Sequence, residues 1–152
     1  MFGIDPRMAG HAAHRTMRHH PETMRRADLR SIISDLADRV ASPLLLEDAR
    51  QRTVAYSPQY QAVDELRKEA ILTGSLTPEI IAWSESFGIR TATAPVRTPP
   101  DAERGILARV GIPVRHAGIL LGYSWAIDPD ERLGQDELAV LMEEAADIAA
   151  LL

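Results

Sequence analysis

The sequence predicts an α+β fold in which helices pack on an antiparallel sheet. Residues 28–41 and 135–152 carry apolar residues at helical spacing, so each is expected to form an amphipathic helix. Residues 106–114 alternate apolar and other side chains, and 119–127 is uncharged on both faces, as in a central strand. A short His-Ala-Gly turn separates these two strands, which makes them antiparallel.

The composition limits the class of protein. The 152 residues fit one domain, and 45% hydrophobic and 26% charged residues are typical of a globular chain. The absence of Cys excludes disulfides, thiolate nucleophiles, zinc fingers and iron–sulfur clusters. No apolar run reaches the roughly 18 residues of a membrane span, and the N-terminus has no signal-peptide core. We therefore expect a cytoplasmic protein that does not enter a membrane.

Residues 1–26 are expected to form an irregular, basic leader, because they show no sustained apolar period. Residues 1–30 contain six Arg and three acidic residues, so binding of nucleic acid by the leader is one hypothesis. The net charge of −5 for the whole chain argues against it. His11 and His14 are three residues apart, but no acidic or Cys partner completes a metal site, and we predict none.

Asp28 is the expected N-cap of the first helix, which ends before a Pro. Leu44–Leu46 is predicted as a short buried strand, 47–51 as a turn and 53–56 as the returning strand. Two helices follow. The first is expected at 61–73.

Gly74 is the predicted C-cap of that helix. The second helix is expected to begin at Thr77, followed by Pro at its first position, and to end at Gly88. Ile89–Val96 is predicted as a strand, and Pro99–Asp101 as the loop after it.

The strand 119–127 is expected to present two different faces. One face carries Ile119, Leu121, Tyr123, Trp125 and Ile127. The other carries Leu120, Gly122, Ser124 and Ala126, small enough on average for a helix to approach closely.

Gly134 and Glu137 mark the start of the last helix, whose apolar stripe still runs at Leu152, so the helix is expected to continue to the end of the sequence. Its acidic side has two interpretations. It is either the solvated side of an amphipathic helix, or part of a helix pair that associates with the same pair of a second subunit.

Residues 112–123, Ile-Pro-Val-Arg-His-Ala-Gly-Ile-Leu-Leu-Gly-Tyr, resemble the signature hairpin of GAF domains, which sense small molecules and are related to PAS domains. Three stretches also resemble the N-terminal sensory region of PucR-type (CdaR/PucR-like) bacterial transcription regulators. They are Leu44–Ser57, Trp83 with 88–93, and Leu121–Trp125. The resemblance covers about 28–152.

The resemblance implies that residues 27–152 form a GAF-like sensor domain that dimerises through helices 28–41 and 135–152. Such regulators carry a C-terminal helix-turn-helix. None is visible in this sequence, so we expect no direct DNA binding by this chain.

We also expect that the chain is not an enzyme and needs no cofactor. The sequence has no nucleophile elbow, no HExxH and no phosphate loop. The GAF-fold enzyme that reduces methionine sulfoxide depends on cysteines, which this chain lacks. His116 lies in the predicted hairpin turn, where a solvated side chain is the ordinary interpretation.

A ligand site is expected between the helix 77–88 and the sheet face that carries Tyr123 and Trp125. Aromatic rings give a ligand flat apolar contact, and an arginine without a carboxylate partner would bind an anionic group. The candidate residues are Tyr56, Trp83, Arg90, Arg97, Arg109, Tyr123 and Trp125. The expected partner is a small metabolite that is either anionic or rich in amide groups. The alternatives are that the aromatic residues are ordinary core, and that the chain is a dimerisation module without a ligand.

Overall fold

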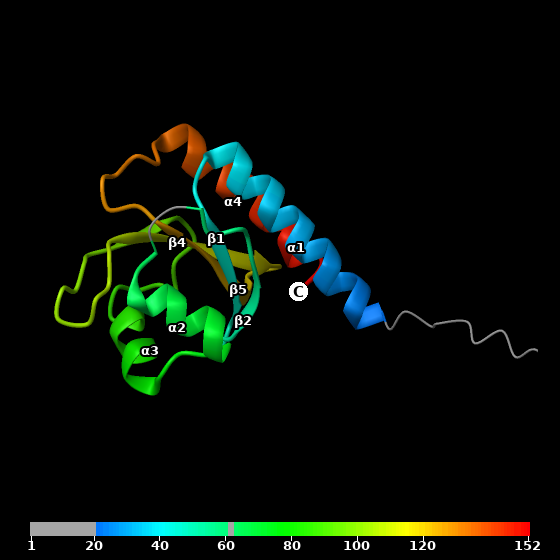
Figure 1. Cartoon of the computed structure of the whole chain (residues 1–152). Coiled ribbons are helices and arrows are strands. Elements are labelled where there is room, and N and C mark those ends of the chain that lie inside the picture. Colours follow the sequence, from blue (N-terminus) through cyan, green and yellow to red (C-terminus); the bar gives the residue numbers. More distant parts are fainter. Residues whose placement is uncertain (1–20, 61–62) are drawn as a thin grey trace, which may run out of the picture.

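The structure, a computed structural model, describes residues 21–60 and 63–152. The predicted α+β fold is confirmed (Figure 1). The elements are α1 (Pro21–Val40), β1 (Leu44–Asp48), β2 (Thr53–Tyr56), α2 (Glu65–Thr73), α3 (Pro78–Glu85), β3 (Val96–Thr98), β4 (Arg109–His116), β5 (Ile119–Ile127) and α4 (Gln135–Ala149).

The strands form one antiparallel sheet in the order β2-β1-β5-β4-β3. The predicted hairpin of β4 and β5 lies at its centre. Ala117 and Gly118 both have positive φ, 49° and 78°, and this is the backbone twist that two-residue hairpin loops favour. β5 is therefore the central strand that its uncharged faces predicted.

The two terminal helices α1 and α4 lie side by side on one face of the sheet (Figure 1). Arg39 of α1 and Glu144 of α4 form an ion pair of 3.0 Å across their contact. The main core lies between these helices and the sheet, and includes Leu29, Ile33, Leu36, Val40, Leu44, Leu46, Val110, Ile112, Val114, Ala126, Leu141, Ala145 and Ile148. The apolar stripes that predicted both helices are thus buried within the chain.

Helix α1 begins at Pro21 and so crosses the boundary expected between the leader and the domain. Asp28 lies inside the helix and is not its N-cap. Glu22 lies in the first turn of the helix as the structure describes it, where an acidic side chain is favourable. No side chain of residues 22–28 is buried, so this part of the helix has no apolar periodicity from which the sequence could predict it. Residues 1–20, with His11 and His14, lie outside the described part.

The prediction of a strand at Ile89–Val96 is wrong for most of its length. The strand β3 begins only at Val96, and the residues before it form turns. The guanidinium of Arg115 donates to the carbonyl oxygens of Ala92 (2.9 Å) and Arg90 (2.6 Å). A side chain from β4 therefore satisfies backbone groups that a strand neighbour would otherwise bind.

A β-bulge changes the faces of β5 near its start. Val114 pairs with Gly122 and Arg115 with Leu120, so Leu121 is the extra residue. As a result Leu121 packs on the core under α1 and α4, whereas Leu120 packs with Tyr123 on the opposite face. The predicted alternation is correct from Gly122 onward and reversed for the two leucines.

Helix α4 starts as predicted, with the carboxylate of Glu137 accepting from the N–H of Gly134 at 3.0 Å. It ends at Ala149, three residues before the predicted end. Leu152 turns back onto the sheet, where its Cδ1 would lie 3.2 Å from a Cβ on Gly122. Within residues 21–60 and 63–152, no helix is both long and apolar enough to span a bilayer.

Candidate ligand-binding site

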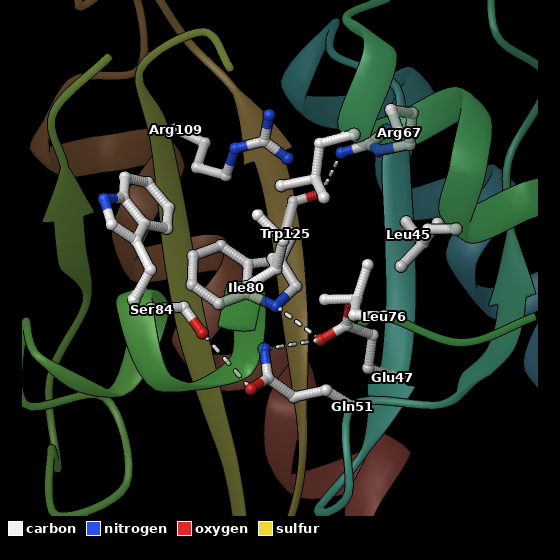
Figure 2. A pocket seen from close by; sticks show the side chains of 12 residues that line it. Leu45, Glu47, Gln51, Arg67, Leu76, Ile80, Ser84, Arg109 and Trp125 are labelled. Atoms are coloured by element: carbon white, nitrogen blue, oxygen red, sulfur yellow. Dashed lines mark hydrogen bonds between the residues drawn. The ribbon is translucent and has the colours of Figure 1, made fainter. Parts of the chain in front are cut away.

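A small cavity lies on the face of the sheet opposite α1 and α4, beneath α2 and α3 (Figure 2). Its volume of about 20 Å³ is enough for about one water molecule. Its lining is Leu45, Glu47, Gln51, Leu66, Arg67, Ala70, Leu76, Ile80, Trp83, Ser84, Arg109 and Trp125. The cavity lies between α3 and the strand that carries Trp125, the elements between which the sequence predicts a ligand site.

Two tryptophans form aromatic walls of the cavity. Trp125 is buried, with its ring centroid 6.1 Å from that of Tyr123. Trp83 of α3 is half-buried and meets Phe87 edge to face at 5.0 Å. These contacts fix both indoles and leave their remaining surfaces toward the cavity.

Glu47 places a carboxyl group inside the cavity, because alternation along β1 directs it to the same face as Leu45. Its side chain accepts hydrogen bonds from the indole N–H of Trp125 at 2.9 Å and from the amide of Gln51 at 3.5 Å. The carbonyl oxygen of that amide in turn accepts from the hydroxyl of Ser84 at 3.2 Å, which ties the network to α3. Burial raises the pKa of Glu47 from 4.5 to about 7.

Arg67 of α2 is 2% exposed and is one of the residues that line the same cavity. It donates to the carbonyl oxygen of Trp125 and to the side-chain oxygen of Gln59, both at 2.9 Å. Both acceptors are neutral. Among the described residues, no carboxylate lies within 4.0 Å of this guanidinium. Burial lowers the pKa of Arg67 to about 10.

Arg109 also lines the cavity, but it has a buried partner. Its guanidinium pairs with the carboxylate of Asp64, which is itself the N-cap of α2. That carboxylate accepts further hydrogen bonds from the backbone N–H groups of Arg67 (2.9 Å) and Leu107 (2.8 Å). Asp64 therefore joins the start of α2 to β4 and compensates the charge of Arg109.

No protein-family model matches the chain. Two curated proteins of Bacillus subtilis (strain 168) match much of it. The DNA-binding transcriptional activator AdeR is 25% identical over 122 residues, 77% of this chain and 29% of AdeR. The proline-responsive transcriptional activator PutR is 24% identical over 131 residues, 83% of this chain and 32% of PutR. The chain is similar to part of each activator. It spans about a third of their length or less.

Solved structures share the fold. The type II free methionine-R-sulfoxide reductase of Thermoplasma acidophilum superposes with a TM-score of 0.52 at 14% identity, over 87% of this chain and 94% of that protein. The inducer-binding domain of the transcription factor PobR from Acinetobacter, in complex with 3-hydroxybenzoic acid, has a TM-score of 0.47 at 15% identity. That match covers 81% of this chain and 96% of that domain.

The reductase corrects the expectation that the chain is not an enzyme. That expectation was drawn from a resemblance to sensor domains and from the lack of known motifs, and a protein with this fold is an enzyme. One fold can support different functions, so the absence of a familiar motif does not exclude an activity.

Three of the seven residues predicted for the site line the cavity: Trp83, Arg109 and Trp125. Tyr123 is buried beside it, packed with Ile89 and Trp125. Tyr56 lies on the edge strand β2 and is 44% exposed, away from the cavity lining.

The remaining two predicted arginines have partners of their own. Arg90 pairs with Glu85 at 3.2 Å, and Arg97 pairs with Asp128 at 2.9 Å. All three predicted arginines, including Arg109, therefore have a carboxylate partner in the fold. The fold brings Asp128 and Asp64 to their arginines from 31 and 45 residues away, whereas Glu85 is only five residues from Arg90.

Sequence reasoning missed the polar residues that distinguish the cavity: Glu47, Gln51, Arg67 and Ser84. Two signals were present. Glu47 is two residues after Leu45, at the spacing of one strand face. Arg67 lies four residues after Val63 and three before Ala70, within the apolar stripe of its helix.

No group of three or more His, Asp or Glu side chains that could hold a metal ion occurs in the described part of the chain. His116 lies at the exposed end of β4. The polar groups of the cavity can form hydrogen bonds and ion pairs with an organic ligand.

Proposed function

We propose that the chain is the ligand-sensing domain of a bacterial transcription regulator, GAF-like and of the PucR type, and that the cavity under α2 and α3 binds a small metabolite. The similarity to part of AdeR and PutR supports a regulatory role. The name of PutR describes a response to a small molecule, proline, and we extend only the idea of a small metabolite to this chain. Because transcription in bacteria takes place in the cytoplasm, we propose that location.

The observation that carries the proposal is the pair of buried ionisable side chains, Glu47 and Arg67, that line one small cavity and have no oppositely charged group within 4.0 Å. Burial of an unpaired charge costs folding free energy. A core that served only stability would do better with apolar residues of similar volume at both positions. A ligand that binds both side chains would compensate this cost and explain why the two residues are ionisable.

The cavity must enlarge to admit a ligand, because metabolite sites commonly need roughly 300 Å³ or more. Helix α3 is the element best placed to move. Ser84 is the one buried residue of this fully described helix, and its hydroxyl bond to Gln51 anchors it to the cavity. We propose that the ligand displaces α3 outward and selects an open conformation.

Glu47 also gives a route from the cavity to the terminal helices. A Cβ on Gly122 would lie 2.1 Å from the carbonyl oxygen of Glu47 and 3.2 Å from Cδ1 of Leu152. This close packing places the backbone of a cavity residue next to the segment that follows α4. A shift of β1 would therefore displace the segment after α4 and, with it, the terminal helices. We propose that the chain forms a homodimer through these helices.

The dimer would use the outer faces of α1 and α4, because their apolar stripes are buried within the chain. Met24 on α1 is 56% exposed and is one candidate contact. DNA binding would then belong to another part of the regulator or to a partner, and not to this chain.

A dimerisation module without a ligand is the second candidate. The small volume of the cavity, about 20 Å³, favours it. On this hypothesis side chains fill the space where a ligand would bind, and the chain functions only by dimerising through its terminal helices.

Thermal denaturation of the 152-residue chain with a compound panel separates the two candidates. The panel contains the common amino acids, carboxylic acids, nucleotides and purine derivatives. A compound at about 100 times its Kd should raise the Tm by roughly 5–10 °C, because it binds only the folded state. If no compound of any class raises the Tm, the sensing function is contradicted and the dimerisation module is favoured.

A further inference from the structure

We infer that the ligand of this cavity is a zwitterion, a small molecule with one ammonium and one carboxylate group, whose ammonium binds Glu47 and whose carboxylate binds Arg67. The inference rests on the proposed function and adds the chemical class of the ligand. It differs from the sequence-based expectation of an anionic or amide-rich ligand.

Glu47 is the anionic end of the cavity. It is 3% exposed, and its two hydrogen-bond donors, the indole of Trp125 and the amide of Gln51, are both neutral. No cationic side chain of the described residues lies within 4.0 Å of its carboxylate. A ligand ammonium would supply the missing charge. The raised pKa of Glu47 agrees with this, since a cation would then replace a proton at neutral pH.

Arg67 is the cationic end. Its two acceptors, a backbone carbonyl and the Gln59 amide, carry no charge. Of the acids near it in sequence, Asp64 is used by Arg109 and by backbone N–H groups, and Glu65 pairs with Lys68. Arg67 therefore has unused donors on a buried guanidinium. A ligand carboxylate is the group that such a planar fork binds best.

Trp125 separates the two ends and touches both. Its indole N–H donates to Glu47, and its carbonyl oxygen accepts from Arg67 (Figure 2). In this view the guanidinium groups of Arg67 and Arg109 lie at one end and Glu47 at the other. A ligand that lies along the indole would reach both charges at once.

The rest of the lining indicates the body of the ligand. Apart from Gln51, Ser84 and Arg109, which pairs with Asp64, the remaining walls are apolar or aromatic: Leu45, Leu66, Ala70, Leu76, Ile80 and Trp83. These side chains favour a small aliphatic group and offer no further full charge. The class that fits is a neutral aliphatic amino acid, with either an α-amino or a more distant amino group.

Calorimetric titration of the chain with amino acids and their single-charge analogues tests the inference. The probes are glycine, L-alanine, L-valine, L-proline, β-alanine and 4-aminobutyrate. Each is matched with its deaminated acid and its carboxamide, for example propionate and L-alaninamide. At least one zwitterion should bind about tenfold or more tightly than both of its analogues, since each charge-assisted contact is lost in one of them.

Variants identify the residues. Glu47→Gln should reduce the preference for the zwitterion over its deaminated acid to less than about threefold, and Arg67→Gln should do the same for its carboxamide. Arg90→Gln, which changes an exposed arginine outside the cavity lining, should leave both preferences unchanged. A purely structural role for Glu47 or Arg67 would weaken all three compounds alike and leave the ratios intact.

The outcomes are separable from those of the proposed function. If only anions or other non-zwitterionic compounds bind, or if the single-charge analogues bind as tightly as the zwitterion, this inference is overturned while ligand sensing stands. If nothing in the wider panel binds, the proposed function itself fails. The relative affinities of the unmodified chain for the zwitterion and its single-charge analogues test the inference even where a variant does not fold.

Discussion

The indole ring of Trp125 lies directly over Gly111 of the neighbouring strand. The two residues are paired between β5 and β4, and a Cβ on Gly111 would lie 2.7 Å from Cζ3 and Cη2 of the ring. The absence of a side chain at Gly111 therefore lets the indole lie against the sheet. In that position its N–H reaches Glu47 and its face forms a wall of the cavity.

Gly111→Ala should lower the free energy of unfolding by roughly 1–3 kcal/mol, because the added methyl group must displace a buried ring. Urea denaturation followed by circular dichroism measures this. The control is the double variant with Trp125→Phe, whose smaller ring removes the atoms in conflict. Its cost should be less than the sum of the two single costs. If the two costs were strictly additive, the loss of stability in Gly111→Ala would not come from contact with the ring of Trp125.

Glu47 should make the protein less stable as the pH rises. Its pKa in the folded state, about 7, lies above its ordinary 4.5, so the folded state binds the proton more tightly than the unfolded state. This contribution is fully present below about pH 4.5 and is lost as the pH rises through about 7, with a total of roughly 3 kcal/mol.

The comparison of the chain with Glu47→Gln isolates this term, because the other titrating groups are shared. Urea denaturation at pH 5 and pH 8 should show the stability of the unmodified chain falling relative to that of the variant. An unchanged difference between the two proteins would mean that Glu47 does not titrate in this range.

Asp64→Ala should be among the most destabilising single substitutions in the described part of the chain. It leaves the buried Arg109 without its carboxylate and removes the N-cap of α2, for a cost of roughly 3–5 kcal/mol. Glu79→Ala is the control, since it breaks the solvent-exposed pair with Arg104 and should change little. Equal effects of the two substitutions on the urea midpoint would contradict the importance given to the buried pair.

Helix α3 should exchange its amide hydrogens faster than β5. The helix buries only Ser84, whereas β5 is the central strand of the sheet. Hydrogen–deuterium exchange with mass spectrometry on peptides from 78–85 and 119–127 measures the difference. Equal protection of the two segments would remove the argument that α3 moves to admit a ligand.

Local patterns were sufficient to predict most of the fold. The hairpin of β4 and β5 has the alternation of a strand and a turn with Gly118 at positive φ, and the caps Thr77 and Gly74 lie where the sequence places them. These features depend on neighbours in sequence. The segment before Val96 was predicted wrongly because the side chain that decides its structure, that of Arg115, comes from a distant strand.

The site was harder to predict for the same reason. Arg97 and Asp128 are 31 residues apart, and Arg109 and Asp64 are 45 apart, so only the folded sheet brings each pair together. Arg67 was overlooked because its neighbours Glu65, Lys68 and Glu69 give the helix a charged character. Its burial follows from its place within the apolar stripe, which composition alone conceals.

Fluorescence of Trp125 tests most directly whether the cavity is the ligand site. The chain has two Trp, so Trp83→Phe leaves Trp125 as the single reporter, hydrogen-bonded to Glu47. A compound that raises the Tm should change the emission of this variant saturably, with the Kd found by calorimetry for the same variant. A compound that stabilises the variant but leaves the emission of Trp125 unchanged would bind elsewhere and contradict the account.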